Sequence, residues 1–136
     1  MNVRLAKNAD GKRIQQLVED NGFPSWDFLD WTDIEPYWLV AEDKDIIGCV
    51  QTVLAKPVGR LEYIAVERTL SHMQKARALK MLIKQASLTL SLSGVNVVGG
   101  TVGFDNKGLK KIYKRRGAVT VMQGNVMMAR NAFEVA

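Results

Sequence analysis

Apolar and polar positions change their period several times along this chain, and each change marks the start of a new predicted element. Alternation over residues 3–6 predicts a short strand. Apolar positions then recur at helical spacing over 14–18, with Asn8 or Asp10 as the expected N-cap of a helix. The residues after this helix, 25–31, have mixed spacing and predict either a short helix or an ordered loop.

Strand signals dominate the middle of the chain. Three stretches are rich in β-branched and aromatic residues and are separated by turns, which predicts an antiparallel meander over 37–41, 46–54 and 60–66. Ser71 then precedes Gln74 by three residues in a capping-box pattern, and helical spacing follows to about Leu92. The remaining segments predict a buried strand, a short basic helix and one or two final strands, over 95–102, 106–116 and 118–129.

The predicted order is therefore β-α-α-β-β-β-α-β-α-β, without an internal repeat or a linker. A helix connects the strands at 60–66 and 95–102, so these two strands should be parallel within an otherwise antiparallel sheet. The chain has 136 residues, of which 47% are hydrophobic and 24% charged, and this suits one packed α/β domain over residues 1–136.

Charge is distributed unevenly along the chain. Seven of the 14 acidic residues lie between Asp27 and Asp45, whereas the later segments 75–84 and 107–116 are basic and the formal net charge is +5. This basic side suits an anionic partner. The lone Cys49 has no partner for a disulfide, and polar residues interrupt the longest apolar stretch, so we expect a cytoplasmic protein without a membrane span.

Three segments occur in an order that narrows the fold further. They are 3–6 before Asp10, the run Leu-Glu-Tyr-Ile-Ala-Val at 61–66, and Asp105-Asn106 before Tyr113 and Arg116-Gly117. Together they resemble the GNAT superfamily of N-acetyltransferases over nearly the whole chain. The resemblance implies a GNAT fold of the α/β (α+β) class, with a mixed sheet of six to seven strands, helices on both faces, and acetyl-CoA as cosubstrate.

The resemblance also assigns parts of the chain to acetyl-CoA. In the family, backbone groups at the end of the fourth strand hold the pantetheine arm, and this end corresponds here to Ile64, Ala65 and Val66. The amides that open the next helix hold the pyrophosphate, where the helix dipole favours negative charge, and they correspond to Gln74, Lys75, Ala76, Arg77 and Ala78. Asn106 would bind the cofactor arm or cap its own helix.

The loop before that helix departs from the family pattern. Where relatives carry Gln or Arg, then Gly, then Gly or Ala, this chain has Met73, Ala76 and Ala78, and only the last conforms. Glycine permits close approach of the backbone to phosphate, so Ala76 would narrow the site or change the path of the loop. Lys75 and Arg77 can pair with phosphates instead, or form a basic solvated helix face.

Direct acetyl transfer to an amine needs a general base for the amine and an acid that reprotonates the leaving thiolate. By resemblance Tyr113 supplies the acid, although it equally completes the apolar face of its helix. Glu62 is the candidate base, or else faces solvent. Thr101 stands where some relatives place a glutamate, and a base acting through water, or none, stays open. Cys49 is expected to be a small core residue, and the sequence has no metal-ligand cluster.

Aromatic and acidic residues mark the expected acceptor side. Trp26, Asp27 and Trp31 fall where GNAT proteins build one wall of the acceptor groove and could receive a cationic amine, or they simply pack on the sheet. Three functions follow: an N-acetyltransferase acting on a small-molecule or protein amine, an inactive GNAT-like structural or interaction protein of phage or mobile-element type, and a nucleic-acid-binding module through 107–116. The segment 107–116 has no aromatic residue other than Tyr113, which counts against nucleic-acid binding. The late strands would allow a homodimer.

Overall fold

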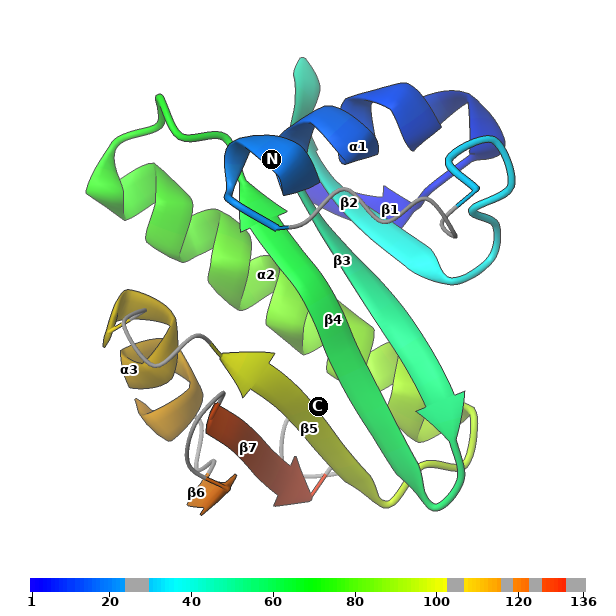
Figure 1. The fold of residues 1–136 in the computed structure, drawn as a ribbon, viewed down its shortest axis with the longest axis vertical. Coiled ribbons are helices and arrows are strands. Elements are labelled where there is room, and N and C mark those ends of the chain that lie inside the picture. The colour runs from blue at the N-terminus through cyan, green and yellow to red at the C-terminus, as the bar shows by residue number, and fades with distance from the viewer. Residues whose placement is uncertain (24–29, 103–106, 116–118, 123–125, 132–136) are drawn as a thin grey trace. The chain divides into compact units, whose positions relative to one another are not determined.

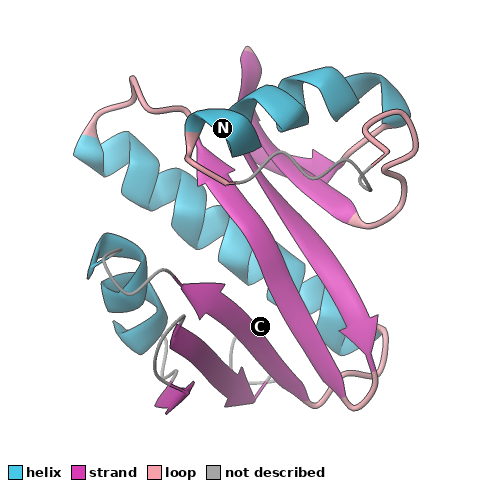
Figure 2. Cartoon of the chain, in the orientation of Figure 1, coloured by secondary structure: helices cyan, strands magenta, loops and turns pink. Residues whose placement is uncertain are grey.

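The computed structural model describes residues 1–23, 30–102, 107–115, 119–122 and 126–131, and has an α+β fold with a mixed sheet (Figures 1 and 2). Its three α-helices are α1 (Gly11–Asp20), α2 (His72–Leu92) and α3 (Lys107–Arg115). The chain divides into two compact units. Unit 1 contains Met1–Gln51 and Tyr63–Ile83, and unit 2 contains Thr52–Glu62 and Lys84–Ala136.

Unit 1 contains two antiparallel strand pairs, of which the sequence predicts the second. β1 (Asn2–Leu5) pairs with β2 (Trp38–Asp43), and β2 pairs with β3 (Asp45–Ala55). The register places Val40 opposite both Arg4 and Cys49. Because β2 is buried at four successive positions, it forms the centre of this part of the sheet.

The predicted parallel pair of strands lies in unit 2. β4 (Val58–Val66) pairs in parallel with β5 (Val97–Val102), from Val58 opposite Val97 to Leu61 opposite Gly100. β5 then pairs antiparallel with β7 (Val126–Asn131), which pairs antiparallel with β6 (Val119–Met122). Since α2 lies between β4 and β5 in the chain, the prediction of a parallel pair joined by a helix is confirmed.

The apolar face of α1 packs into the core of unit 1. Ile14, Leu17 and Val18 are at most 1% exposed and belong to a cluster with Trp38, Cys49 and residues of the neighbouring strands. The helix ends as predicted, because the amide of Asn21 donates to Leu17 O and Gly22 takes a positive φ of 82°. Within the described residues, no helix is long and apolar enough to cross a membrane.

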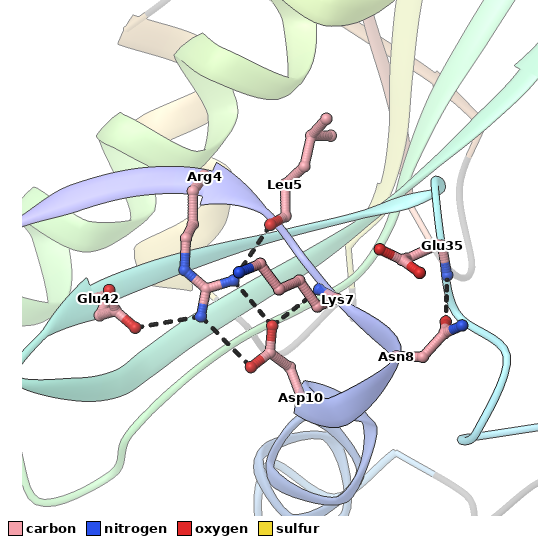
Figure 3. A network of polar contacts seen from close by, with 7 residues as sticks. All are labelled: Arg4, Leu5, Lys7, Asn8, Asp10, Glu35 and Glu42. Atoms are coloured by element: carbon pink, nitrogen blue, oxygen red, sulfur yellow. Dashed lines mark hydrogen bonds and ion pairs between the residues drawn. The ribbon is translucent and has the colours of Figure 1, made fainter.

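A polar network ties β1 to the start of the first helical segment (Figure 3). Arg4 donates to Asp10 Oδ2 at 2.8 Å and to Glu42 Oε2 at 3.1 Å, and the amide of Lys7 donates to the same Asp10 oxygen at 2.8 Å. The hydrogen bond from Arg4 is the main reason why the pKa of Asp10 is lowered. Asp10 therefore caps the short 3-10 helix η1 (Asn8–Asp10).

Asp10 lies at the N-cap position of α1, as predicted, but its side chain makes no hydrogen bond to this helix, because its carboxylate faces Arg4 and the amide of Lys7. Asn8 instead accepts the amides of Ile34 and Glu35 at 2.9 and 3.0 Å, and so fixes the loop before β2.

Gly11 opens α1 against the backbone of the same loop. A Cβ built at Gly11 would lie 1.6 Å from Trp31 O, a distance that no relaxed structure allows. We expect Gly11→Ala to lower the free energy of unfolding by about 1–3 kcal/mol, as overpacking does, although Gly→Ala inside a helix normally stabilises by up to about 1 kcal/mol. Urea unfolding measures the difference, with exposed Lys12→Ala as the control within about 0.5 kcal/mol of the wild type. A stabilised Gly11→Ala variant would contradict this packing.

Candidate functional site

The strand β4 has an irregular backbone at Tyr63. This residue has a φ of 51°, in the left-handed region that non-glycine residues rarely occupy. The parallel register with β5 ends two residues earlier, at Leu61 opposite Gly100, whereas β4 continues to Val66. The irregularity therefore lies between Glu62 and Ile64, where the sequence predicts the catalytic base to meet the cofactor-binding backbone.

Cys49 supports the backbone beyond this irregularity. Its thiol is fully buried, lies 3.8 Å from Tyr63 O as a donor, and accepts a hydrogen bond from the amide of Ala65. Burial raises the pKa of Cys49 to about 12, so the thiol stays neutral and is no nucleophile. The prediction of a small core residue is confirmed, but the sequence did not indicate its contact with β4.

The end of β4 is tied to α1 by polar side chains. Asn21 Nδ2 donates to Val66 O at 2.9 Å and to Leu17 O at 2.8 Å. Arg13 forms an ion pair with Glu67 at 2.6 Å, and this pair is the main cause of the lowered pKa of Glu67. The Val66 carbonyl and the Ala65 amide therefore both have a hydrogen-bond partner already.

The first turn of α2 forms the predicted capping box. The amide of Ser71 donates to Gln74 Oε1 at 3.0 Å, and the amide of Gln74 donates to Ser71 Oγ at 3.2 Å. The amide of Lys75 donates to Ser71 O at 2.9 Å. The amides of Gln74 and Lys75 are thus hydrogen-bonded to Ser71. The amides of His72 and Met73 lie in the first turn of α2, where a helix offers them no backbone acceptor of its own.

The remaining predicted phosphate-binding residues differ in exposure. Arg77 is exposed, Lys75 and Ala76 are partly buried, and Ala78 is fully buried. Ala78 therefore belongs to the packing face of α2, whereas Arg77 keeps its guanidinium in solvent. Asn106, predicted to bind the cofactor arm, lies outside the described residues.

A polar hollow lies at the C-terminal end of α1. It has a volume of about 460 Å³ and is lined by Glu19, Asp20, Asn21, Gly22 and Arg68. Arg68 reaches across it and donates to Asp20 O at 3.2 Å. Sequence analysis did not find this hollow, because it joins the end of one helix to a loop 48 residues later.

Tyr113 has a buried hydroxyl without a hydrogen-bond partner in the part of the chain that the structure describes. Its side chain is 6% exposed and shares the apolar face of α3 with Leu109 and Ile112, as the sequence predicts. Burial, and to a lesser extent the charge of Glu62, raises the pKa of Tyr113 above that of an ordinary tyrosine. The phenol therefore stays protonated at neutral pH.

The charge of Glu62 contributes to the raised pKa of Tyr113, and both predicted catalytic residues belong to unit 2. The Glu62 side chain is 24% exposed, and Arg60 Nε lies 3.7 Å from one of its oxygens. Burial raises the pKa of Glu62, and Arg60 opposes this shift. The raised pKa of Glu62 lies closer to neutral pH, as suits a general base, whereas the raised pKa of Tyr113 keeps its phenol protonated and makes it a weaker acid than an ordinary tyrosine.

Trp31 is part of an aromatic cluster in unit 1. Its ring lies 5.8 Å from that of Trp38, which stacks on Tyr63 at 6.0 Å, and Phe23 meets Tyr63 edge-on at 5.5 Å. Trp31, Phe23 and Tyr63 are partly exposed and pack against the core. The sequence did not indicate Phe23 and Tyr63. The other predicted acceptor residues, Trp26 and Asp27, lie outside the described residues.

Metal ligands do not cluster in the described ranges. No group of three or more His, Cys, Asp or Glu side chains there could hold a metal ion.

Glu62 and Glu67 have similar exposure, 24% and 25%, but opposite pKa shifts. A carboxyl group whose pKa is raised on folding stabilises the fold at low pH, where it is protonated, and this contribution is lost as the pH rises. A carboxyl group whose pKa is lowered on folding stabilises the fold at higher pH, where it is charged, and this contribution is lost as the pH falls. From about pH 4 to about pH 8 we therefore expect the Tm of Glu62→Gln to rise relative to the wild type, and that of Glu67→Gln to fall. Thermal unfolding across this pH range measures both. The same sign for both variants would contradict the assigned environments.

Comparisons with known proteins identify the fold. No protein-family model matches the sequence, and no curated protein sequence matches it. Among solved structures, a GNAT-family acetyltransferase from Staphylococcus aureus Mu50 has 14% identity and a TM-score of 0.77, with 96% of this chain and 98% of that chain covered.

Two further solved structures contain coenzyme A. Diaminobutyrate acetyltransferase from Paenibacillus lautus, in complex with L-2,4-diaminobutyric acid and coenzyme A, has 16% identity and a TM-score of 0.72, over 96% and 94% of the two chains. PaiA N-acetyltransferase from Thermoplasma acidophilum, in complex with coenzyme A, has 12% identity and a TM-score of 0.74, over 96% and 98%. The chain therefore has the GNAT fold.

Proposed function

We propose that this protein is an N-acetyltransferase that moves an acetyl group directly from acetyl-CoA to an amine. The fold supports the proposal, because solved structures with this fold include acetyltransferases bound to coenzyme A. The observation that carries it is the hydroxyl of Tyr113, which is buried, lacks a partner among the described residues and lies within electrostatic reach of Glu62. An unpaired buried hydroxyl costs stability, and a role in catalysis explains why it is kept.

The chemistry assigns one proton to each residue. The amine nitrogen attacks the thioester carbonyl carbon, the new C–N bond replaces the C–S bond, and the leaving thiolate needs a proton. Tyr113 is the proposed donor of that proton, because its hydroxyl is protonated at neutral pH and has no hydrogen-bond partner among the described residues. Glu62 accepts the proton that the amine loses, since its raised pKa makes it a stronger base than an ordinary glutamate.

Acetyl-CoA binding is proposed for the backbone at the end of β4 and for the start of α2. Ile64, Ala65 and Val66 would hold the pantetheine arm, with Val66 O already fixed by Asn21. The first amides of α2 would face the pyrophosphate, supported by the predicted residues Gln74, Lys75, Ala76, Arg77 and Ala78. Asn106 would contact the cofactor arm. Because the Gln74 amide is used by the capping box, the amides of His72 and Met73 are the better donors.

The acceptor is proposed to be an amine received beside Trp26, Asp27 and Trp31. The partly exposed cluster around Trp31 offers aromatic faces to a cation, and acidic residues surround it in the sequence. We further propose that residues 1–136 form one cytoplasmic domain with a sheet of six to seven strands and helices on both faces, and that it pairs as a homodimer. The chain passes between its two units three times, which favours a single domain.

An acetyl-transfer assay with small amines, polyamines, aminoglycosides and peptides with free N-termini tests the proposal. We expect thiol release that depends on one class of amine, and a kcat about 10²–10⁴-fold lower in Tyr113→Phe with a similar KM for acetyl-CoA. Tyr37→Phe is the matched control, because Tyr37 is 57% exposed, and should leave kcat unchanged. Absence of transfer to every amine would favour the inactive GNAT-like protein, and an unchanged kcat in Tyr113→Phe would remove this residue from the mechanism.

A further inference from the structure

The hydroxyl of Tyr113 rests against a strand position that has no side chain. A Cβ built at Gly100 would lie 2.9 Å from Tyr113 Oη and 3.3 Å from Tyr113 Cζ. Real Cβ atoms do not approach other heavy atoms to less than 3.0 Å. Among the described residues, the glycines with a positive φ are Gly22 and Gly94. Gly100 is therefore required for space and not for its backbone conformation.

This contact lies on the parallel pair of β4 and β5. Gly100 is opposite Leu61 in the register, and its virtual Cβ would also lie 3.5 Å from Leu61 O. Glu62 follows Leu61 in the chain and acts on the hydroxyl through its charge. The phenol of Tyr113 thus packs against the backbone of Gly100, on the strand pair that also contains the candidate base Glu62.

Among the described residues, packing holds the Tyr113 hydroxyl at this position. No hydrogen bond orients Tyr113 Oη within the described residues, and the ring is held by the apolar face of α3, with Leu109 and Ile112 beside it. A tyrosine ring is rigid beyond its two side-chain torsions, so a methyl group at residue 100 would displace the hydroxyl and strain the packing of α3.

We propose that Gly100 is a positioning residue that sets the place of the Tyr113 hydroxyl for proton donation to the leaving thiolate. This inference rests on the proposed function. The proton passes from Oη to the thiolate sulfur, and its transfer requires a short, aligned approach of the two atoms. A side chain at residue 100 acts on the rate through the hydroxyl and leaves the binding of acetyl-CoA nearly unchanged.

A double-mutant cycle tests this role with Gly100→Ala, Tyr113→Phe and the double variant, measuring Tm, kcat and the KM for acetyl-CoA. We expect Gly100→Ala to lower kcat by about tenfold or more while changing KM by less than about threefold. In the Tyr113→Phe background the same substitution should lower kcat no further, because the displaced hydroxyl is absent. The decrease in Tm caused by Gly100→Ala should also be smaller in the Tyr113→Phe background, because the hydroxyl oxygen that lies 2.9 Å from the virtual Cβ is absent there.

Gly59→Ala is the matched control. Gly59 lies on β4, and its virtual Cβ would meet Leu90 at 2.9 Å and Val95 at 3.1 Å, without Tyr113 among its nearest neighbours. This variant should lose the same Tm and the same factor in kcat in both backgrounds.

Equal fold-losses of kcat for Gly100→Ala in both backgrounds would overturn the inference, as would full activity of the single variant. If the wild type transfers no acetyl group, the proposed function fails and the positioning role fails with it, but the Tm cycle still decides whether Gly100 seats the hydroxyl. If Gly100→Ala does not fold, a folded double variant supports the contact between Gly100 and the Tyr113 hydroxyl. An unfolded double variant overturns the inference, because the new methyl group then clashes with the backbone and not with the hydroxyl.

Discussion

The left-handed conformation of Tyr63 is the constraint around which the described parts of this protein are organised. A strand residue with a φ of 51° cannot continue a regular ladder, and the parallel register of β4 with β5 ends at Leu61. Several of the backbone groups that follow are bonded to other residues of unit 1. Cys49 takes the amide of Ala65, Asn21 takes the carbonyl of Val66, and the amide of Glu67 donates to Ile47 O at 2.8 Å. These contacts hold the irregular strand in place and offset its conformational cost.

The part of β4 that belongs to unit 2 contains Glu62, the proposed base. Glu62 and Tyr113 are both shifted by burial toward their neutral forms, and neither is neutralised by a close hydrogen-bonded partner that the structure describes. An ion pair built for stability would instead lower the pKa of its carboxylate, as Arg13 does for Glu67. The contrast between Glu62 and Glu67, five residues apart on one strand and its loop, supports the proposed catalytic role of Glu62 and a structural role of Glu67.

Patterns within a few residues of the sequence predicted the structural features that depend on interactions between residues close together in the chain. The helical period of α1, the hairpin of β2 and β3, the crossover helix and the Ser71–Gln74 capping box are each encoded within a few residues, and each is confirmed. Asp10 occupies the predicted N-cap position of α1, but the sequence did not indicate that Arg4 and the Lys7 amide bind its carboxylate in place of the helix.

Contacts that join distant residues left no such pattern. The contact of Asn21 with Val66 spans 45 residues, and that of Cys49 with Tyr63 spans 14. The family resemblance indicated Tyr113 and Glu62 as a pair, but not the seat at Gly100, because a glycine in an apolar strand has several structural explanations. The resemblance also indicated the α2 amides, but only the capping box revealed that the Gln74 amide is already used.

Equilibrium binding of acetyl-CoA, measured by titration calorimetry on the whole chain, tests the central claim most directly. If the GNAT fold here retains its cofactor site despite Met73 and Ala76, one molecule of acetyl-CoA should bind per chain, and its affinity should weaken with added salt, because phosphates meet the start of α2 and its basic side chains. No detectable binding at millimolar acetyl-CoA would contradict the account.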